Sequence, residues 1–429
     1  MSRERKLVSL GAGGMDPASV KDYESIGGFS ALRKAFGMSP ESIVSELKAA
    51  VLLGRGGAAY PAGSKWEHLL HIEGEPKYVV CNADEGEPGT FKDRLILGKL
   101  PLRLIEGMAI AGLVFSARKG FIYCRGEYRA IQRGLAKALS AARAAGYLGS
   151  DILGTGFSYD IDIVSGAGAY VCGENSALLN STEGIVGRPR IKPPHLAEVG
   201  LFLKPTLVNN VETLASVPAV VGMGGKAFLS EGHPDSGGTK LVCLSGHVVR
   251  PGVYEIPLGR LTLRELIFDP DFGDGIRGGS QFKFAHLGGQ SGPILSRDKL
   301  DVPYGYSDLR KAGLAVGSGA IVVMDQSVSV LDYLETVSAF FAHESCGKCV
   351  PCREGNKAML RYLGLLRVKG ALPEDGLAGL RDAADAMARA SFCGLGQSAA
   401  TALRTAWKAF PEEFAANVTK GGVTIPAAG

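Results

Sequence analysis

The sequence has little of what a membrane span or a nucleic-acid-binding surface needs. Its longest apolar run, around residues 107–115, is far shorter than the ~20 residues that a transmembrane helix requires. Its formal net charge is only +4, from 47 basic and 43 acidic residues, and no basic tract carries interleaved aromatic side chains. We therefore expect no direct membrane insertion and no nucleic-acid partner.

The sequence also lacks the features of a secreted protein. Residues 1–6 are rich in charge, and neither an apolar stretch nor a small-residue cleavage site follows them. A reducing environment is therefore expected, in which cysteines stay free of disulfides. We predict a cytoplasmic protein, either soluble or attached peripherally to the cytoplasmic membrane through a complex.

Four of the eight cysteines form the most informative pattern in the chain. Cys346, Cys349 and Cys352 are each separated by two residues, and Cys393 lies well downstream. Three thiolates at this spacing hold one side of a cubane iron–sulfur cluster while a distant fourth closes it. Structural zinc is an alternative, but zinc sites usually pair two knuckles of two ligands each. The other cysteines each stand alone and are expected to be small core residues: Cys81, Cys124, Cys172 and Cys243.

The length of 429 residues and the hydrophobic content of 46% exceed what one compact core accommodates, so two or three domains are expected. Predicted strands near 78–81, 120–124 and 159–164 alternate with predicted helices such as 129–145. This alternation favours an α/β domain, in which ligands bind at the carboxyl ends of the strands. Residues 1–39 have little periodicity and are expected to form a surface-lying lead-in.

The pattern changes near residue 235. Short strands without long helices between them predict a small α+β module at 240–244, 247–249, 253–256, 282–287 and 320–324. From residue 332 onward the pattern is helical.

Clustered glycines suggest that the backbone approaches a ligand. The loop of residues 54–66 holds four glycines together with Arg55 and Lys65, and backbone N–H groups in such a loop can accept phosphate oxygens beside a fixed positive charge. Glycine-rich turns are commoner than cofactor sites, so the loop alone is weak evidence. No G-x-G-x-x-G follows a strand, which makes a conventional dinucleotide site a poor match.

Three carboxylates stand within four residues, at Asp84, Glu85 and Glu87. They repel one another, so an enclosed arrangement needs amide, hydroxyl or cationic partners, which a flavin ring, a ribityl chain or a nicotinamide ribose could supply. An exposed acidic turn is the alternative.

Several motifs together resemble the family of flavin-bearing 51-kDa subunits of respiratory complex I. The resemblance covers about residues 40–420, in order. The family also includes flavin subunits of NAD-linked hydrogenases and formate dehydrogenases. The motifs that carry it are Gly54-Arg55-Gly56-Gly57, residues 81–90, residues 166–174, Lys204-Pro205-Thr206, Asn209-Asn210-Val211-Glu212-Thr213 and residues 346–353.

The resemblance implies a multi-domain α/β protein with three modules. These are a Rossmann-like domain that binds FMN and NAD over 40–235, a ubiquitin-like (β-grasp) α+β domain over 236–328, and a helical bundle over 329–429. Cys346, Cys349, Cys352 and Cys393 would hold a [4Fe-4S] cluster in the bundle. FMN would take a hydride from NADH, or give one to NAD+, and single electrons would pass to the cluster.

The resemblance also implies positions for the cofactors. No side chain need act as a nucleophile or general base, and Glu85 and Glu87 would lie where nicotinamide stacks on the flavin. The matching FMN contacts are Gly54, Arg55, Gly56, Gly57, Lys65, Asn82, Asp84, Glu85, Tyr170, Gly173, Glu174, Asn209, Asn210 and Thr213.

Three departures from the family concern the nucleotide. Tyr60, His68 and His195 replace the phenylalanines that usually surround adenine. Asn175 replaces a carboxylate that usually meets the adenosine ribose, and its loss could admit the 2′-phosphate of NADPH. Phe91, where many complex I versions have cysteine, is more similar to the hydrogenase and formate dehydrogenase relatives.

Three functions therefore stay open. The first is an NADH-oxidising or NAD+-reducing flavin subunit of a complex I type oxidoreductase. The second is a diaphorase subunit of a soluble NAD(P)-linked hydrogenase or formate dehydrogenase, which could prefer NADPH. The third is an electron relay without nucleotide binding. The expected partners are a small thioredoxin-like [2Fe-2S] subunit and a larger iron–sulfur subunit.

Overall fold

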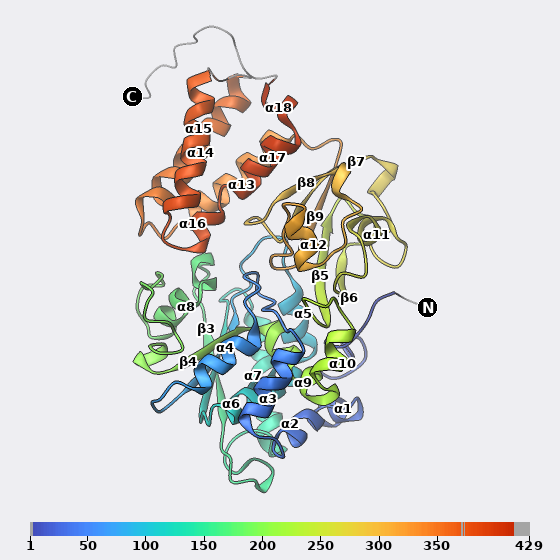
Figure 1. Ribbon diagram of the computed structural model, residues 1–429, viewed down its shortest axis with the longest axis vertical. Helices are drawn as coiled ribbons and strands as arrows, with labels where there is room; N and C mark the ends of the chain where they lie inside the picture. Colours follow the sequence, from blue (N-terminus) through green and yellow to red (C-terminus); the bar gives the residue numbers. More distant parts are fainter. Residues whose placement is uncertain (1–2, 370–371, 373, 416–429) are drawn as a thin grey trace.

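The computed structural model describes residues 3–369, 372 and 374–415. Figure 1 shows a parallel sheet surrounded by helices at one end, a smaller mixed sheet beside the middle, and a group of helices at the other end. A multi-domain α/β fold is therefore confirmed, whereas the finer domain types and the bounds at 40, 236 and 329 stay predictions. Among the described residues, no helix combines the length and the apolar character that crossing a membrane requires.

The first sheet consists of four parallel strands in the order β3-β2-β1-β4. They are β1 (Tyr78–Ala83), β2 (Lys119–Cys124), β3 (Asp160–Ser165) and β4 (Thr206–Asn210). The chain adds β2 and β3 on one side of β1 and then returns to add β4 on the other. The order thus reverses between β1 and β4, and in open α/β sheets such a switch point is where ligands bind.

Two largely buried helices form the centre of this part. They are α6 (Pro101–Val114) and α9 (Val211–Met223), and both are apolar almost all round, as expected for helices enclosed in a core. A Cβ at Gly107 would lie 2.0 Å from the carbonyl oxygen of Leu214, so only glycine lets the two helices approach this closely. The other helices around the sheet are α3 (Pro40–Ala49), α4 (Ala62–Leu70), α5 (Lys92–Lys99), α7 (Arg129–Ala144), α8 (Asn175–Thr182) and α10 (Gly225–Ser230).

The first forty residues were expected to lie on the surface, and this is wrong for most of them. They form α1 (Val20–Ser25) and α2 (Ser30–Ala35), and Tyr23, Phe29 and Leu32 are buried in the same core as α6 and α9. The two helices have only six residues each, so neither is long enough to show a helical period in the sequence.

The second sheet has five strands in the order β6-β5-β9-β7-β8. β5 and β9 are parallel, and the other pairs are antiparallel. Residues 247–249, predicted as a strand, contribute only a single bridge between Val248 and Ile276. The elements are β5 (Thr239–Gly246), β6 (Gly252–Pro257), β7 (Phe282–Leu287), β8 (Ile294–Ser296), β9 (Ala320–Asp325), α11 (Leu263–Phe268) and α12 (Tyr306–Lys311).

The C-terminal part is helical, as the sequence predicts. One apolar core joins it to both sheets, because Val80 of β1 and Phe284 of β7 belong to the same cluster as Phe341 and Leu363. Residues 416–429, part of the predicted helical module, lie outside the described residues. The helices are α13 (Val330–Glu344), α14 (Val350–Lys369), α15 (Glu374–Ala390), α16 (Gly394–Ser398), α17 (Thr401–Ala409) and α18 (Pro411–Ala415).

Candidate functional site

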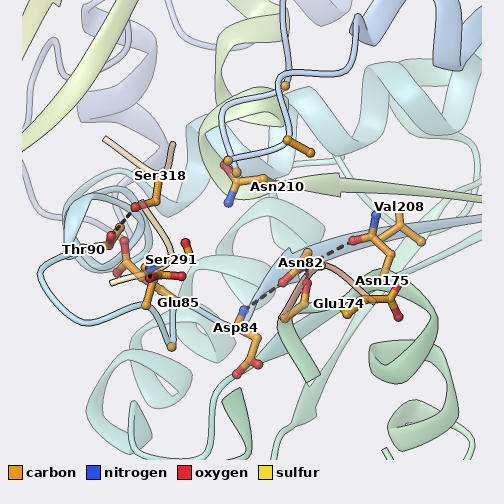
Figure 2. Close-up of a pocket in the computed structure, with 18 of the residues that line it drawn as sticks. Asn82, Asp84, Glu85, Thr90, Glu174, Asn175, Val208, Asn210, Ser291 and Ser318 are labelled. Carbon is orange, nitrogen blue, oxygen red and sulfur yellow. Dashed lines mark hydrogen bonds between the residues drawn. The ribbon is translucent and has the colours of Figure 1, made fainter. Parts of the chain in front are cut away.

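A cavity of about 560 Å³ opens at the carboxyl ends of β1 and β4, where the strand order reverses. Its volume is in the range typical of cofactor sites. Figure 2 shows Asn82, Asp84, Asn175 and Asn210 around it, on segments that follow different strands. Most of the residues matched to FMN line this cavity: Gly54, Gly56, Gly57, Lys65, Asn82, Asp84, Glu85, Tyr170, Gly173, Glu174, Asn209, Asn210 and Thr213.

The glycine loop forms one wall. A Cβ at Gly56 would lie 2.9 Å from the Cβ of Asn210, so the loop backbone passes directly against the end of β4. Gly57 has a φ of +124°, a left-handed conformation that other residues rarely adopt. Lys65 points its Nζ at the carbonyl of Val208 over 3.0 Å, and burial together with the nearby charge of Lys192 lowers the pKa of Lys65 to about 8. The loop thus offers backbone donors beside a buried amine.

Arg55 differs from its sequence prediction. Its side chain is fully buried away from the cavity, where Nη2 donates to the carbonyl of Gly237 at 2.7 Å and the guanidinium lies over the ring of Tyr306. Its backbone N–H donates to Thr213 Oγ1 at 2.8 Å. The expectation that Arg55 places a positive charge beside the glycine loop is therefore wrong. Lys92 and Lys192 line the cavity instead, and neither was predicted.

Glu85 is enclosed by the start of α5. It is 5% exposed, and its carboxylate accepts the backbone N–H groups of Asp93 at 2.7 Å and Arg94 at 2.9 Å. The Tyr128 hydroxyl also donates to it at 3.1 Å. Burial, and secondarily the charge of Asp93, raises the pKa of Glu85 to about 7. An exposed acidic turn is thereby excluded here, because protein donors hold this carboxylate in the interior.

Glu87 is held from two sides. The Tyr170 hydroxyl donates to one carboxylate oxygen, and the backbone N–H of Ser291 donates to the other at 2.9 Å. Burial raises the pKa of Glu87. Tyr170 and Ser291 also line the cavity, so Glu87 forms part of a hydrogen-bonded wall.

Asp84 is the acidic group with capacity left for a ligand. Burial raises its pKa to about 7, although the charge of Arg125 opposes the shift. Its Oδ2 is buried and has no hydrogen-bond partner among the described residues. Buried polar atoms are almost always satisfied, so an unpartnered oxygen facing a cavity fits a polar ligand that donates to it.

Asn82 joins β1 to the segment before α8. Its Nδ2 donates to the carbonyl of Gly173 at 2.9 Å and to Oδ1 of Asn175 at 3.2 Å (Figure 2). Glu174 caps α8, because it accepts the N–H groups of Ser176 and Ala177, and it pairs with Lys192 at 2.8 Å. Burial opposes the shift, but these donors and the charge of Lys192 hold the pKa of Glu174 below its usual value.

The four residues matched to the nucleotide separate into two pairs. Tyr60 and Asn175 line the cavity, and Tyr60 is 55% exposed at its rim. His68 and His195 are not among the lining residues. Their rings lie 6.4 Å apart, and His68 Nε2 lies 3.9 Å from Glu198. The structure thus brings the two histidines together, but it does not place them in the cavity wall.

A buried charge network lies beside the cavity, and sequence reasoning missed it. Lys92 Nζ contacts Asp93 at 2.7 Å and Glu212 at 3.0 Å, and Lys240 Nζ contacts Glu212 at 2.5 Å. All four side chains are at most 4% exposed. Lysine at the start of β5, inside an apolar run, was the available signal, because a lysine there needs a buried partner.

The four predicted cluster cysteines converge on a second, smaller cavity. Cys346 follows α13, Cys349 and Cys352 stand at the start of α14, and Cys393 precedes α16. All four are free thiols, and Cys349 Sγ accepts the N–H of Phe392 at 3.4 Å. In the described part of the chain, no three His, Cys, Asp or Glu side chains are arranged to hold a single metal ion. A set of four thiols around one cavity is the donor set that a [4Fe-4S] cluster uses.

The two cavities share a wall. Val171 and Leu395 line both the larger cavity and the one bordered by the cysteines. Val171 follows Tyr170, and Leu395 lies two residues beyond Cys393. A group in the larger cavity and one among the cysteines would therefore be separated by little more than these two apolar side chains.

The single cysteines also agree with the sequence prediction. Cys81, Cys124, Cys172 and Cys243 are buried, as expected for core residues.

Comparison with known sequence families gives two matches. The family described as the Nuo51 FMN-binding domain matches residues 47–219, which include the glycine loop, the acidic loop and β4. The family described as the NADH-ubiquinone oxidoreductase-F iron-sulfur binding region matches residues 332–417, which include all four converging cysteines.

Curated relatives extend the likeness over nearly the whole chain. The NADH-quinone oxidoreductase F subunit 2 of Rhizobium meliloti (strain 1021) is 44% identical over 92% of this chain and 93% of the relative. The NADP-reducing hydrogenase subunit HndC of Solidesulfovibrio fructosivorans is 39% identical over 97% of this chain and 84% of the relative. Among solved structures, an NAD+-reducing [NiFe]-hydrogenase in the H2-reduced state matches with a TM-score of 0.82 and 32% identity, over 98% of this chain and 68% of that chain.

Proposed function

Since this chain belongs to the NADH-quinone oxidoreductase family of F subunits, we propose that it oxidises NADH at FMN and passes single electrons to a [4Fe-4S] cluster. The shared wall of Val171 and Leu395 is the observation that carries this proposal, because it brings the cofactor cavity against the four cysteines. When bound, FMN supplies a centre that accepts two electrons as hydride and can release them singly. The remaining work of the chain is to bind, orient and exclude water.

The residues around the larger cavity fit FMN. The glycine loop gives backbone donors, Lys65 adds a buried amine, and Asp84 has an unpartnered oxygen. We propose that FMN is held without a covalent bond by the predicted contacts, with Arg55 acting through its backbone. Its side chain instead helps to fix Thr213 and the segment around Gly237.

The nicotinamide would be positioned by Glu85 and Glu87. Both carboxylates are held by the protein's own donors, so each occupies one place before a ligand arrives. Such preorganisation limits the entropy that binding costs. Tyr60, exposed at the rim, is the proposed stacking surface for adenine. His68 and His195 would take part only at the outer edge of the site.

The three-module organisation belongs to the same proposal. Residues 40–235 would be the Rossmann-like FMN domain, 236–328 the ubiquitin-like domain, and 329–429 the helical cluster domain. The N-terminal residues 1–39 would be an integral part of the first domain, because Tyr23, Phe29 and Leu32 are in its core.

The relatives are named as subunits of an NADH-quinone oxidoreductase and of a hydrogenase, so this chain is a subunit that acts with partners. We propose that these partners are a small thioredoxin-like [2Fe-2S] subunit and a larger iron–sulfur subunit, in a complex I type oxidoreductase. The complex would be cytoplasmic, or attached to the cytoplasmic face of the membrane through other subunits.

A second candidate, a diaphorase that prefers NADPH, is favoured by Asn175. This residue lines the cavity, carries no charge, and accepts a hydrogen bond from Asn82. A carboxylate at this place would repel a 2′-phosphate, and the amide does not. The likeness to a subunit of an NADP-reducing hydrogenase points the same way.

Nucleotide preference separates the two candidates. The purified complex is assayed with ferricyanide as acceptor, and kcat/KM is compared for NADH and NADPH in the wild type, Asn175→Glu and Asn175→Gln. A complex I type subunit prefers NADH in all three proteins. A diaphorase for NADPH loses its preference in Asn175→Glu and keeps it in Asn175→Gln, which matches the glutamate in length but carries no charge.

A further inference from the structure

His286 lies on β7, outside the cavity, with both ring nitrogens in hydrogen bonds. Its Nε2 lies 3.0 Å from the carbonyl oxygen of Gly292, and its Nδ1 lies 2.9 Å from the hydroxyl of Tyr333. A carbonyl only accepts, so Nε2 carries the hydrogen, and Nδ1 then accepts from the Tyr333 hydroxyl. The side chain is fully buried, and burial lowers its pKa to about 4, so the ring stays neutral in this one tautomer at neutral pH.

The turn that His286 holds touches the cavity. Residues 288–293 connect β7 to β8, and the N–H of Gly292 closes the turn on the carbonyl of Gly289 at 3.0 Å. Ser291 in this turn lines the cavity and donates its N–H to Glu87. A Cβ at Gly289 would lie 2.2 Å from Cγ of Glu87, so the turn is pressed directly on this glutamate.

Helix α13 supports Glu87 from both sides. Near the start of α13, Tyr333 donates to His286, which holds the turn that bears Ser291. At the end of α13, Glu344 accepts the backbone N–H of Tyr170 at 3.0 Å, and the Tyr170 hydroxyl donates to Glu87. Each arm ends on a different oxygen of the Glu87 carboxylate.

We propose that His286 is a positioning residue for the nucleotide site, which fixes the 288–293 turn and through Ser291 sets the place of Glu87. This inference rests on the proposed function, since it assumes that the cavity binds NAD(P)H beside Glu87. It adds a residue that contacts neither cofactor nor nucleotide and that acts through the hydrogen bond of Nε2 to Gly292.

The test compares His286→Leu and His286→Gln in the purified complex with ferricyanide as acceptor. The leucine removes the donor to Gly292, whereas the glutamine can place an amide N–H near the same carbonyl. Loss of one buried hydrogen bond predicts a KM for the favoured nucleotide about 3- to 10-fold higher in His286→Leu, with kcat, flavin content and the cluster signal unchanged. His286→Gln should retain a KM close to that of the wild type.

Two further variants separate positioning from general loss of stability. Tyr333→Phe removes only the hydroxyl that orients the ring, and should also raise KM. Phe282→Leu alters the same strand on its other face, where Phe282 packs against Phe268, and should lower thermal stability without a change in KM. A wild type that oxidises neither nucleotide would contradict the proposed function itself. A wild type that is active, with KM unchanged in both His286→Leu and Tyr333→Phe, would overturn the inference alone.

Discussion

Glu212 joins the first sheet region to the second, and its charge can be removed with little change in shape. It lies on α9 and is 1% exposed. One carboxylate oxygen contacts Lys240 on β5 at 2.5 Å and Lys92 at 3.0 Å, and the other accepts the N–H of Leu241 at 2.8 Å. Burial alone would raise the pKa of Glu212, but the charges of Lys240 and Lys92 outweigh it and hold the pKa below its usual value.

Glu212→Gln keeps the volume and an acceptor for Leu241, but leaves Lys240 with only the Leu241 carbonyl, at 2.9 Å. Removing one partner of a buried ion pair costs about 3–5 kcal/mol. We expect a loss of about 3 kcal/mol in the free energy of unfolding, at the lower end of that range because Lys92 keeps Asp93 as a partner.

The assay is urea unfolding of the wild type, Glu212→Gln, Lys240→Met and the double variant. The double variant buries neither charge, so it should recover about 1.5 kcal/mol or more relative to the sum of the single variants. FMN content is measured in parallel, because Lys92 and Asp93 line the cavity. A loss under about 1 kcal/mol in Glu212→Gln, or strictly additive losses, would refute the view that this network carries compensated charges.

Three other perturbations test the site. Lys65→Met should weaken FMN binding about tenfold or more, because a charged donor is lost, whereas Lys77→Met, which alters a buried lysine bound to the Leu69 carbonyl, should leave FMN affinity unchanged. Cys393→Ser should disturb the cluster's spectroscopic signal and onward transfer while nucleotide still reduces the flavin, and an unaltered cluster would remove Cys393 from the ligand set. The pKa of Asp84 is raised from 3.8 to about 7, so the native chain holds a proton there that the unfolded chain releases, and stability falls as pH rises through that window. In urea unfolding, Asp84→Asn should therefore stabilise the isolated chain by up to about 4 kcal/mol near pH 8 and by little near pH 4, and an equal gain at both pH values would contradict the shift.

Some features of this chain could be predicted from local pattern alone. The strand at 78–81 is a short apolar run that ends in polar residues, and both its position and the site at its carboxyl end are confirmed. The four cysteines converge because their spacing already restricts three of them to one turn and the start of one helix. These predictions held because each depends on residues that are close in sequence.

Features that depend on distant contacts could not be predicted in this way. The direction of the Arg55 side chain is set by the carbonyl of Gly237 and the ring of Tyr306, which belong to a later part of the chain. His68 and His195 match the family by position, but the backbone places them outside the cavity wall. Strand β4 was read only as a motif, because its five residues include two asparagines that do not extend an apolar pattern.

The central claim is that one chain takes a hydride at a flavin and delivers electrons singly to a neighbouring cluster. Anaerobic addition of NADH or NADPH to the chain loaded with FMN and cluster tests it most directly, with flavin absorbance and the cluster's paramagnetic signal followed together. The account predicts that one of the nucleotides bleaches the flavin and that the reduced-cluster signal then rises in the wild type but is altered in Cys393→Ser. A flavin that stays oxidised with both nucleotides, in a chain that holds FMN and an intact cluster, would contradict it.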